Sequence, residues 1–341
     1  MIMGMERLPD LASRALGGSV VYASDELFAE RENLIRPEPP VFDASTFGHK
    51  GKVYDGWETR RRRGPGHDVA IVRLGAPGVI RTVVIDTAYF TGNYAPEASL
   101  EACVMNGHPA VADLVAAAWE PVVPRSVLAG DTANRFEVTE PRRWTHVRLA
   151  IYPDGGVARL RVLGDVVPDP RFLAGTIDLA ALENGGSVLD CSDAFYGSPM
   201  NMIMPGRARD MGEGWENARR RGPGNDYVTL RLGATGRLRE VEIDTSYYVG
   251  NAPGEAALTG IDSRAATLGD PHAWVPVLER TRLQPDTRHR IRVDTGPITH
   301  VRLDVYPDGG VARLRLLGEV DPDELAALVE AADAAERDGA P

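Results

Sequence analysis

The sequence has few cysteines and no long apolar segment. Cys103 and Cys191 are its only cysteines, which leaves room for one disulfide but not for a disulfide framework, and this favours the reducing cytoplasm. The longest apolar runs are short, as at residues 111–119, whereas a transmembrane helix needs about 20 apolar residues. Residues 1–10 lack a basic region followed by an apolar core, so we expect no secretory signal there. We therefore expect a cytoplasmic protein without a membrane partner.

Positive charge is also scarce. The chain has 38 Lys and Arg against 49 Asp and Glu, a net charge of −11. This excess of acid argues against a nucleic-acid partner held by bulk attraction. Lys50 and Lys52 are the only lysines, so nearly all basic residues are arginines. Codon bias in a G+C-rich genome explains this, and the alternative is that some arginines bind a carboxylate or ureido group with their planar guanidinium.

The sequence motifs of several large enzyme classes are missing. There is no P-loop, dinucleotide-binding fingerprint, His-Glu-x-x-His pair or Gly-x-Ser-x-Gly nucleophile motif. The seven histidines are scattered and form no Cys/His cluster with zinc spacing. We therefore expect no required cofactor and no metal site. A divalent cation held by Asp and Glu oxygens is the alternative, although no spacing demands one.

The chain contains a long internal repeat, the feature to look for first in any sequence. Residues 56–68 recur at 214–226 with 10 of 13 identical, and residues 145–161 recur at 299–315 with 15 of 17 identical. Residues 86–93 recur at 244–251 with five of eight identical. A length of 341 residues suggests about two domains, so each copy should be one domain.

The domain boundaries follow from the repeat. We expect the first domain at residues 10–167 and the second at 178–320. Between them, residues 168–177 form the linker, because Pro168-Asp169-Pro170 should hold the chain extended. Residues 321–341 remain as a C-terminal helix and tail.

Each copy shows the alternation of β-strands. Val147, Leu149 and Ile151 alternate with more polar residues, and the turn at 153–156 followed by further alternation predicts a hairpin, repeated at 306–317. The other predicted strands are 69–74, 79–86, 99–104, 227–232 and 237–244. Short strands between Gly and Pro turns are typical of an antiparallel sandwich.

Helices are expected in only two kinds of place. One is the short turns at the start of each domain, and the other is the tail. There Asp321-Pro322-Asp323-Glu324 combines a cap residue, a proline in the first turn and a glutamate. An apolar stripe at residues 325–335 suits packing or an oligomer contact.

Candidate catalytic groups cluster after Trp57. Glu58 or Asp68 can serve as a general base, and His67 can carry a proton. The four arginines at 60–63 can bind an anion. The structural alternative makes Trp57 a core residue, the arginines a solvated edge and the Gly-Pro-Gly segment a plain turn.

The two copies differ within this cluster. His67 is replaced by Asn225, which cannot titrate. The first copy is also longer before the cluster, with 31 positions from Asp25 to Gly56 against 21 at the matching place. We expect the first copy to supply most of the chemistry, with drift of a surface loop as the alternative.

Further polar residues recur in both copies. Asp86 and Asn93 follow a strand, where Asp and Asn are either ligands or ordinary turn formers. His146 and His300 fit sheet packing or a domain interface better than catalysis. Cys103 and Cys191 do not correspond between the copies, so neither is a good nucleophile candidate.

Five motifs stand in order along the chain, at residues 51–63, 66–68, 84–87, 90–93 and 306–314. Together they resemble the allantoicase family, over about residues 10–320. The resemblance implies two tandem jelly-roll β-sandwich domains of the galactose-binding-like type, an all-β fold. It also implies hydrolysis of allantoate to ureidoglycolate and urea in purine degradation, and a homo-oligomer, trimer or hexamer.

This reaction suggests roles for the candidate residues. Arg61 and Arg62 would bind the carboxylate of allantoate, with Lys50 as a further substrate-binding residue. Glu58 or Asp68 would be the base and His67 the acid that protonates urea, while Asp86 and Asn93 would hold ureido groups. The second-repeat equivalents are Glu216, Arg219, Arg220, Asp226, Asp244 and Asn251. A tandem carbohydrate-binding or interaction protein without catalysis is the alternative, because a fold alone does not fix function.

Overall fold

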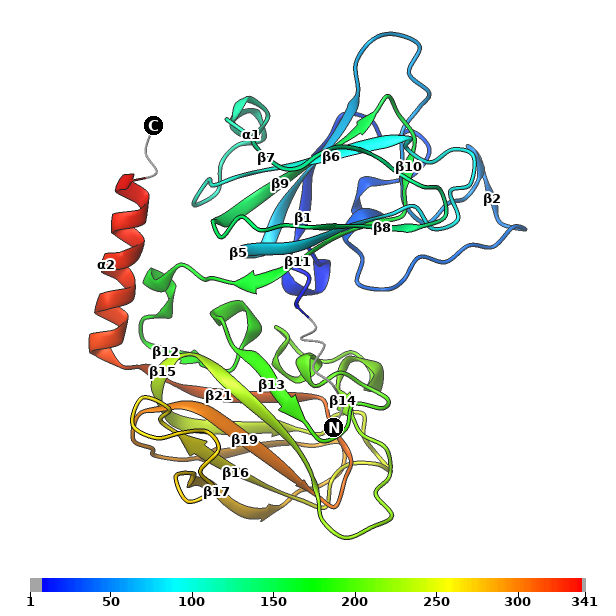
Figure 1. Cartoon of the computed structure of the whole chain (residues 1–341). Coiled ribbons are helices and arrows are strands. Elements are labelled where there is room, and N and C mark those ends of the chain that lie inside the picture. The colour runs from blue at the N-terminus through cyan, green and yellow to red at the C-terminus, as the bar shows by residue number, and fades with distance from the viewer. Residues whose placement is uncertain (1–7, 339–341) are drawn as a thin grey trace. The chain divides into compact units, whose positions relative to one another are not determined.

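The computed structural model describes residues 8–338. Residues 1–7 and 339–341, which include most of the segment considered for a signal and the end of the tail, lie outside the described residues. Backbone contacts divide the chain into two compact units, one ending at Val167 and the other beginning at Pro168. Figure 1 shows that each unit is built mainly of β-strands.

The first unit is an antiparallel β-sandwich. One layer has the strand order β1-β5-β9-β6-β7, while β11 and β8 pair with the other part of β5. The bounds are β1 (Ser19–Ala23), β5 (Asp68–Asp86), β6 (Glu97–Cys103), β7 (Glu120–Val127), β8 (Ala133–Glu137), β9 (Arg143–Tyr152) and β11 (Arg159–Val166). Short pieces are β2 (Phe47–Gly48), β3 (Gly51–Lys52), β4 (Trp57–Glu58) and β10 (Gly156–Val157).

Strand β5 belongs to both layers. Residues 68–73 pair with β9, and residues 79–86 pair with β11 and β8. The register shifts between Arg73 and Gly78, where Gly75 approaches the backbone so closely that a Cβ would lie 2.6 Å from the nitrogen of Gly18. The two strands predicted at 69–74 and 79–86 are therefore one bent strand.

The predicted hairpin across residues 153–156 is wrong. β9 and β11 do not pair with each other, because each pairs with a different half of β5. The turn between them instead carries β10, which pairs with β4 and so reaches Glu58. Gly155 in this turn has a φ of +135° and lies against the backbone of Ala95, so a side chain would not fit there.

The second unit repeats this sandwich. Its order is β12-β21-β15-β19-β16-β17, with β13 and β18 also paired to β15. The bounds are β12 (Thr176–Asp178), β13 (Ser187–Cys191), β14 (Trp215–Glu216), β15 (Asp226–Asp244), β16 (Glu255–Ile261), β17 (Val275–Arg282), β18 (Arg288–Arg292), β19 (Ile298–Tyr306), β20 (Gly310–Val311) and β21 (Arg313–Val320). The predicted tandem β-sandwich architecture is confirmed, with the hairpin at 306–317 corrected as in the first copy.

Large aromatic side chains fill the interiors. Trp57 and Trp215 are fully buried, which confirms the core role weighed for Trp57. The indole N–H of Trp57 donates to the carbonyl of Asp25 at 2.7 Å, and that of Trp215 donates to Asp193 at 2.8 Å. Each tryptophan thus ties the start of its polar motif to the strand-end loop that precedes it.

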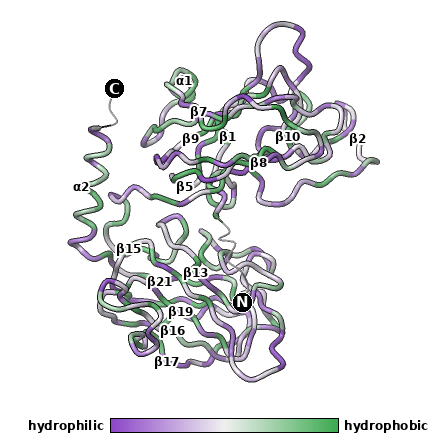
Figure 2. The backbone as a smooth tube through the Cα atoms, viewed as in Figure 1, coloured by the Kyte–Doolittle hydropathy of each residue, from purple (hydrophilic) through white to green (hydrophobic). Residues whose placement is uncertain are grey.

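Within residues 8–338, two α-helices flank the sheets, and only the second of them was predicted. α1 (Val111–Ala116) interrupts the first sandwich. It has six residues, of which only Leu114 is buried, too short for a helical period to show in the sequence. α2 (Pro322–Asp338) confirms the predicted tail helix, whose first turn is capped by Asp321 accepting the N–H groups of Asp323 and Glu324. Figure 2 shows polar and apolar residues alternating along it.

Short 3-10 helices occupy several connections. The segment expected to be an extended linker contains η3 (Pro170–Leu173) and then enters β12, because Asp169 caps the turn by accepting the N–H of Arg171. The others are η1 (Arg14–Leu16), η2 (Arg31–Ile35), η4 (Leu182–Asn184), η5 (Pro199–Ile203) and η6 (Met211–Glu213). Among residues 8–338, no helix has the length and apolar character needed to cross a membrane.

A buried arginine anchors the loop before each motif. Arg159 is 1% exposed; its Nε and Nη1 donate to the carbonyls of Glu38 and Asp55, each at 3.0 Å. Arg313 does the same in the second unit, donating to the carbonyls of Gly206 at 3.1 Å and Glu213 at 2.6 Å. The loops that lead to Trp57 and Trp215 are therefore fixed from inside the sandwich.

Candidate active site

The first element of the site is a carboxylate–amide pair. β4 places Glu58 beside the loop after β5, where the side-chain amide of Asn93 donates to its Oε1 at 2.8 Å. Burial raises the pKa of Glu58, and the hydrogen bond from Asn93 acts in the opposite direction. A carboxyl group with a raised pKa is suited to proton transfer near neutral pH. Glu216 and Asn251 form the same pair at 2.5 Å.

The second element is a buried ion pair. Asp68 is 2% exposed, and its Oδ1 accepts from Arg62 Nη2 at 2.5 Å and from the hydroxyl of Ser24 at 2.9 Å. The backbone N–H of Arg62 donates to Asp154 at 2.7 Å. Asp68 and the guanidinium of Arg62 therefore hold the motif loop to the sheet. Asp68 is buried in this pair, whereas the Arg62 side chain stays 30% exposed.

The same ion pair exists in the second unit. Arg220 bonds to Asp226, which also accepts from the hydroxyl of Ser192 at 2.9 Å. The backbone N–H of Arg220 donates to Asp308 at 2.8 Å. Both copies thus use one arginine of the run internally, a role that the sequence analysis did not foresee.

The remaining charged residues of the motif are exposed. Arg61 and Lys50 have no hydrogen-bond or ion-pair partner within the described part of the chain, and Arg219 repeats this in the second unit. His67 is exposed as well, and its ring lies 4.8 Å from that of Tyr152, centre to centre. These side chains are free to meet a ligand.

The two aspartates that end the long strands make turns. The Oδ1 of Asp86 accepts the N–H of Ala88 at 2.9 Å, and that of Asp244 accepts the N–H of Ser246 at 2.8 Å. Asp86 is half-buried and Asp244 is 1% exposed. The turn-forming role is therefore present in both copies, and Asp244 has almost no surface for a ligand.

The turn at residues 152–156 brings the first motif together. Gly156 pairs with Glu58, Asp154 binds the backbone of Arg62, and Tyr152 contacts the ring of His67. Glu58 and His67 thus lie at opposite ends of this turn. Among the described residues, no hydrogen bond or ring contact joins these two side chains.

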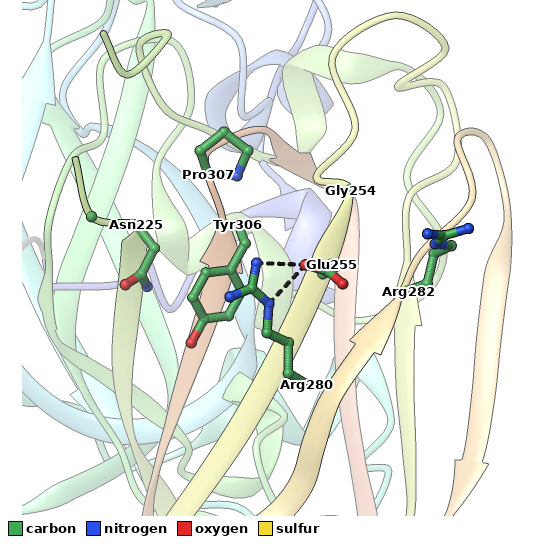
Figure 3. Close-up of a pocket in the computed structure, with 8 residues that line it drawn as sticks. Asn225, Gly254, Glu255, Arg280, Arg282, Tyr306 and Pro307 are labelled. Carbon is green, nitrogen blue, oxygen red and sulfur yellow. Dashed lines mark hydrogen bonds and ion pairs between the residues drawn. The ribbon is translucent and has the colours of Figure 1, made fainter. Parts of the chain in front are cut away.

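Beside this turn lies a second group of side chains, which were not among the predicted site residues. Arg125 lies 4.2 Å above the ring of Tyr152 and pairs with Glu97. In the second unit Arg280 lies 3.9 Å above the ring of Tyr306 and donates to Glu255 through Nε at 2.7 Å. Figure 3 shows this second group. The signal was available, because aligning the two copies end to end matches all three residue types.

The histidines and cysteines of the sheets have no catalytic geometry. His146 is 1% exposed, and burial lowers its pKa to about 4, helped by the charge of Arg73. Burial raises the pKa of the Cys103 thiol to about 11, and both cysteines are free. Within residues 8–338, no group of three or more His, Cys, Asp or Glu side chains is arranged to hold a metal ion.

Comparison with known proteins decides the family. The allantoicase repeat matches this chain twice, at residues 9–167 and 177–321. The chain belongs to the allantoicase family. It is 55% identical over 322 residues to a probable allantoicase of Nocardia farcinica, covering 93% of this chain and 96% of that relative. It is 44% identical over 317 residues to the allantoicase of Dictyostelium discoideum, covering 90% of this chain and 86% of that relative.

Solved allantoicase structures share the fold over most of their length. The crystal structure of allantoicase from Saccharomyces cerevisiae superposes with a TM-score of 0.75 at 35% sequence identity, covering 93% of this chain and 95% of that one. A second allantoicase structure gives a TM-score of 0.76 at 35% identity, with 92% and 94% covered. Both sandwiches of this chain are therefore family features.

Proposed function

We propose that this chain is an allantoicase, a hydrolase that converts allantoate to ureidoglycolate and urea by breaking a carbon–nitrogen bond of a linear amidine. The observation that carries the proposal is the match of both repeats to the allantoicase repeat, at 44% identity to an allantoicase over 90% of the chain. The proposal includes a cytoplasmic role in purine degradation for nitrogen recovery, and assembly as a homo-oligomer, trimer or hexamer.

Glu58 is the base of the proposed mechanism. The product carries a hydroxyl where allantoate carries a ureido nitrogen, so water must be activated at that carbon. Glu58 Oε1 is oriented by Asn93, and burial raises its pKa, while its Oε2 has no partner among the described residues. Asp68, the alternative base, is occupied by Arg62 and Ser24.

The exposed residues of the first motif, together with Lys50 in the loop before it, supply binding and the proton. Arg61 binds the carboxylate, because its guanidinium is free, and Lys50 adds positive charge. Arg62 supports this site by fixing the loop. His67 protonates the nitrogen of the departing urea, and this step requires a titratable group.

The ureido groups of the substrate need hydrogen-bond acceptors. Asn93 uses an amide N–H on Glu58, which leaves its Oδ1 to accept a ureido N–H. Asp86 offers its Oδ2, since Oδ1 is occupied by Ala88. The first repeat therefore holds the full set of roles, whereas the second has Asn225 in place of His67.

The proposal is tested by incubating the purified full-length chain with allantoate and measuring urea and ureidoglycolate. Equal amounts of the two products are expected from the reaction. Formation of neither product, with allantoate shown by calorimetry to bind, would identify an inactive relative and overturn the proposal.

A further inference from the structure

The second sandwich contains a pocket that the proposed mechanism does not use. Its walls come from the residues before β15, the start of β16 and the ends of β17 and β19, and its volume is about 680 Å³. Figure 3 shows Asn225 on one side of Tyr306, with Arg280 held over that ring by Glu255 and Arg282 beyond them. All of these residues belong to the second unit.

The pocket differs from the matching place in the first sandwich by an added charge. The last residue of β7 is Val127, whereas the last residue of β17 is Arg282. Arg282 is exposed and has no hydrogen-bond or ion-pair partner among the described residues. A guanidinium without a partner is the group that binds carboxylates through two parallel hydrogen bonds.

A second difference frees a hydroxyl group. In the first sandwich the hydroxyl of Tyr152 lies 3.0 Å from that of Ser99 and hydrogen-bonds to it. In the second, Ala257 takes the place of the serine, and the hydroxyl of Tyr306 has no partner within the described residues. This hydroxyl can both donate and accept a hydrogen bond.

A third difference supplies a fixed acceptor. Asn225 stands where the first sandwich has His67, and its amide nitrogen donates to Asp304 at 2.8 Å and to the carbonyl of Asp226 at 3.0 Å. Because a carboxylate only accepts hydrogen bonds, this contact fixes the orientation of the amide. Oδ1 of Asn225 therefore remains to accept an N–H from a ligand.

The net electrostatics favour an anion. The two acids nearest these groups are neutralised, Glu255 by Arg280 and Asp304 by Arg302. Arg282 is the one wall charge without a counterion among the described residues. The pocket thus offers a carboxylate site together with groups that bind a ureido carbonyl and a ureido N–H.

We infer that this pocket binds small carboxylates that carry a ureido group, as a ligand site without catalysis. Asn225, which cannot titrate, stands in the place of His67, so the general acid proposed for the first sandwich has no counterpart at this position. The class of ligand rests on the proposed function, because allantoate and ureidoglycolate are both ureido acids. The geometry of the pocket does not depend on that function.

The test uses N-carbamoylglycine, a ureido acid without a second ureido group on its carbon. Phenylglyoxal, which modifies exposed arginines, is applied to the full-length protein, and the modified peptides are followed by mass spectrometry. At ten times its dissociation constant, the ligand should slow modification of Arg282 about ten-fold. Modification of Arg292, an exposed and unpartnered arginine on β18, should not change.

The controls separate this pocket from the proposed activity. N-carbamoylglycinamide, which lacks the carboxylate, should leave Arg282 unprotected, and Arg282→Val and Tyr306→Phe should each weaken N-carbamoylglycine binding at this pocket by at least about ten-fold. Absence of protection at Arg282, or equal protection by the amide, overturns the inference. In that case, hydrolysis of allantoate by the same preparation would still support the proposed function. Conversely, if the preparation does not hydrolyse allantoate, protection of Arg282 by N-carbamoylglycine would still support the ligand site.

Discussion

At the residue scale, Glu58 should set the acidic limb of activity. Glu58→Gln keeps an acceptor for Asn93 but removes the base, so kcat should fall by about 10²–10⁴-fold. Since burial raises the pKa of Glu58, the wild-type rate should begin to fall, as the pH is lowered, at a pH above the pKa of an ordinary glutamate. A pH–rate profile measures both effects.

The matched variant is Glu216→Gln in the second sandwich. We expect Glu216→Gln to lower kcat less than Glu58→Gln does, because the second copy has no histidine at the position of His67. An equal or larger loss than for Glu58→Gln would move the chemistry to the second copy.

The difference between the two repeats suggests a direct test of His67. His67→Asn copies what the second repeat already has, and it should lower kcat by at least about 10²-fold if the imidazole protonates urea. Near-normal turnover would contradict the assignment.

At the scale of elements, the pair of Arg62 and Asp68 attaches the motif loop to β5. Asp68→Asn leaves the guanidinium without its counterion, and breaking such a buried pair costs about 3–5 kcal/mol. Because Arg62 is 30% exposed, the loss should lie near the lower end, about 3 kcal/mol. Urea unfolding measures it, with the exposed Asp43→Asn as the control.

An unchanged unfolding midpoint for Asp68→Asn would contradict this structural role. If activity fell without any loss of stability, Asp68 would return as a catalytic candidate.

The elements also show what the sequence could and could not predict. The alternation near Val147 and Leu149 located strands correctly because period-two burial is a local property. The pairing of β9 and β11 with β5 was missed because Pro-Asp-Gly-Gly resembles a hairpin turn, and partners far apart in the chain leave no local signal. His67 could be identified as a candidate from its own motif, but its contact with Tyr152 could not be predicted, because the two residues are far apart in the chain.

The sequence pointed to the polar residues of the candidate site, but it did not show which of them bind one another. Glu58 and Asn93 meet as neighbours, although they are 35 positions apart. The sequence predicts Arg62 as a carboxylate-binding residue and Asp68 as one of two candidate bases, and the structure adds that their side chains bind each other. Nothing in a list of polar residues shows which charges are neutralised internally.

At the scale of the whole molecule, His146 should make stability fall in acid. Its pKa is about 4 in the folded chain against an ordinary 6.5, so the unfolded chain binds the proton first. The contribution is present above pH 6.5 and is lost as the pH falls toward 4, in total on the order of 3 kcal/mol.

The measurement compares urea unfolding at pH 7 and pH 4.5. His146→Gln should flatten the difference between the two values, whatever its effect on stability at pH 7. The exposed His108→Gln serves as the control. A pH dependence identical to wild type in His146→Gln would contradict the prediction.

The whole molecule also bears on cofactors. Since the proposed base and acid need no metal ion, activity should survive dialysis against a chelator. Allantoate turnover before and after treatment is the measurement. Loss of activity that a divalent cation restores would contradict it.

The arginines that anchor the loops before Trp57 and Trp215 have one more consequence. Arg159 and Arg313 bind main-chain carbonyls, a group that is the same for every amino acid. Arg159 also donates to the side-chain carboxylate of Asp55 at 2.8 Å, so Asp55 is a position where the residue type matters. Substitution elsewhere in the loop, or lengthening between the anchored carbonyls, leaves these bonds intact. The scaffold is tolerant at this point, and that tolerance explains how the first copy could gain ten residues there, Lys50 among them, while both copies kept the same core.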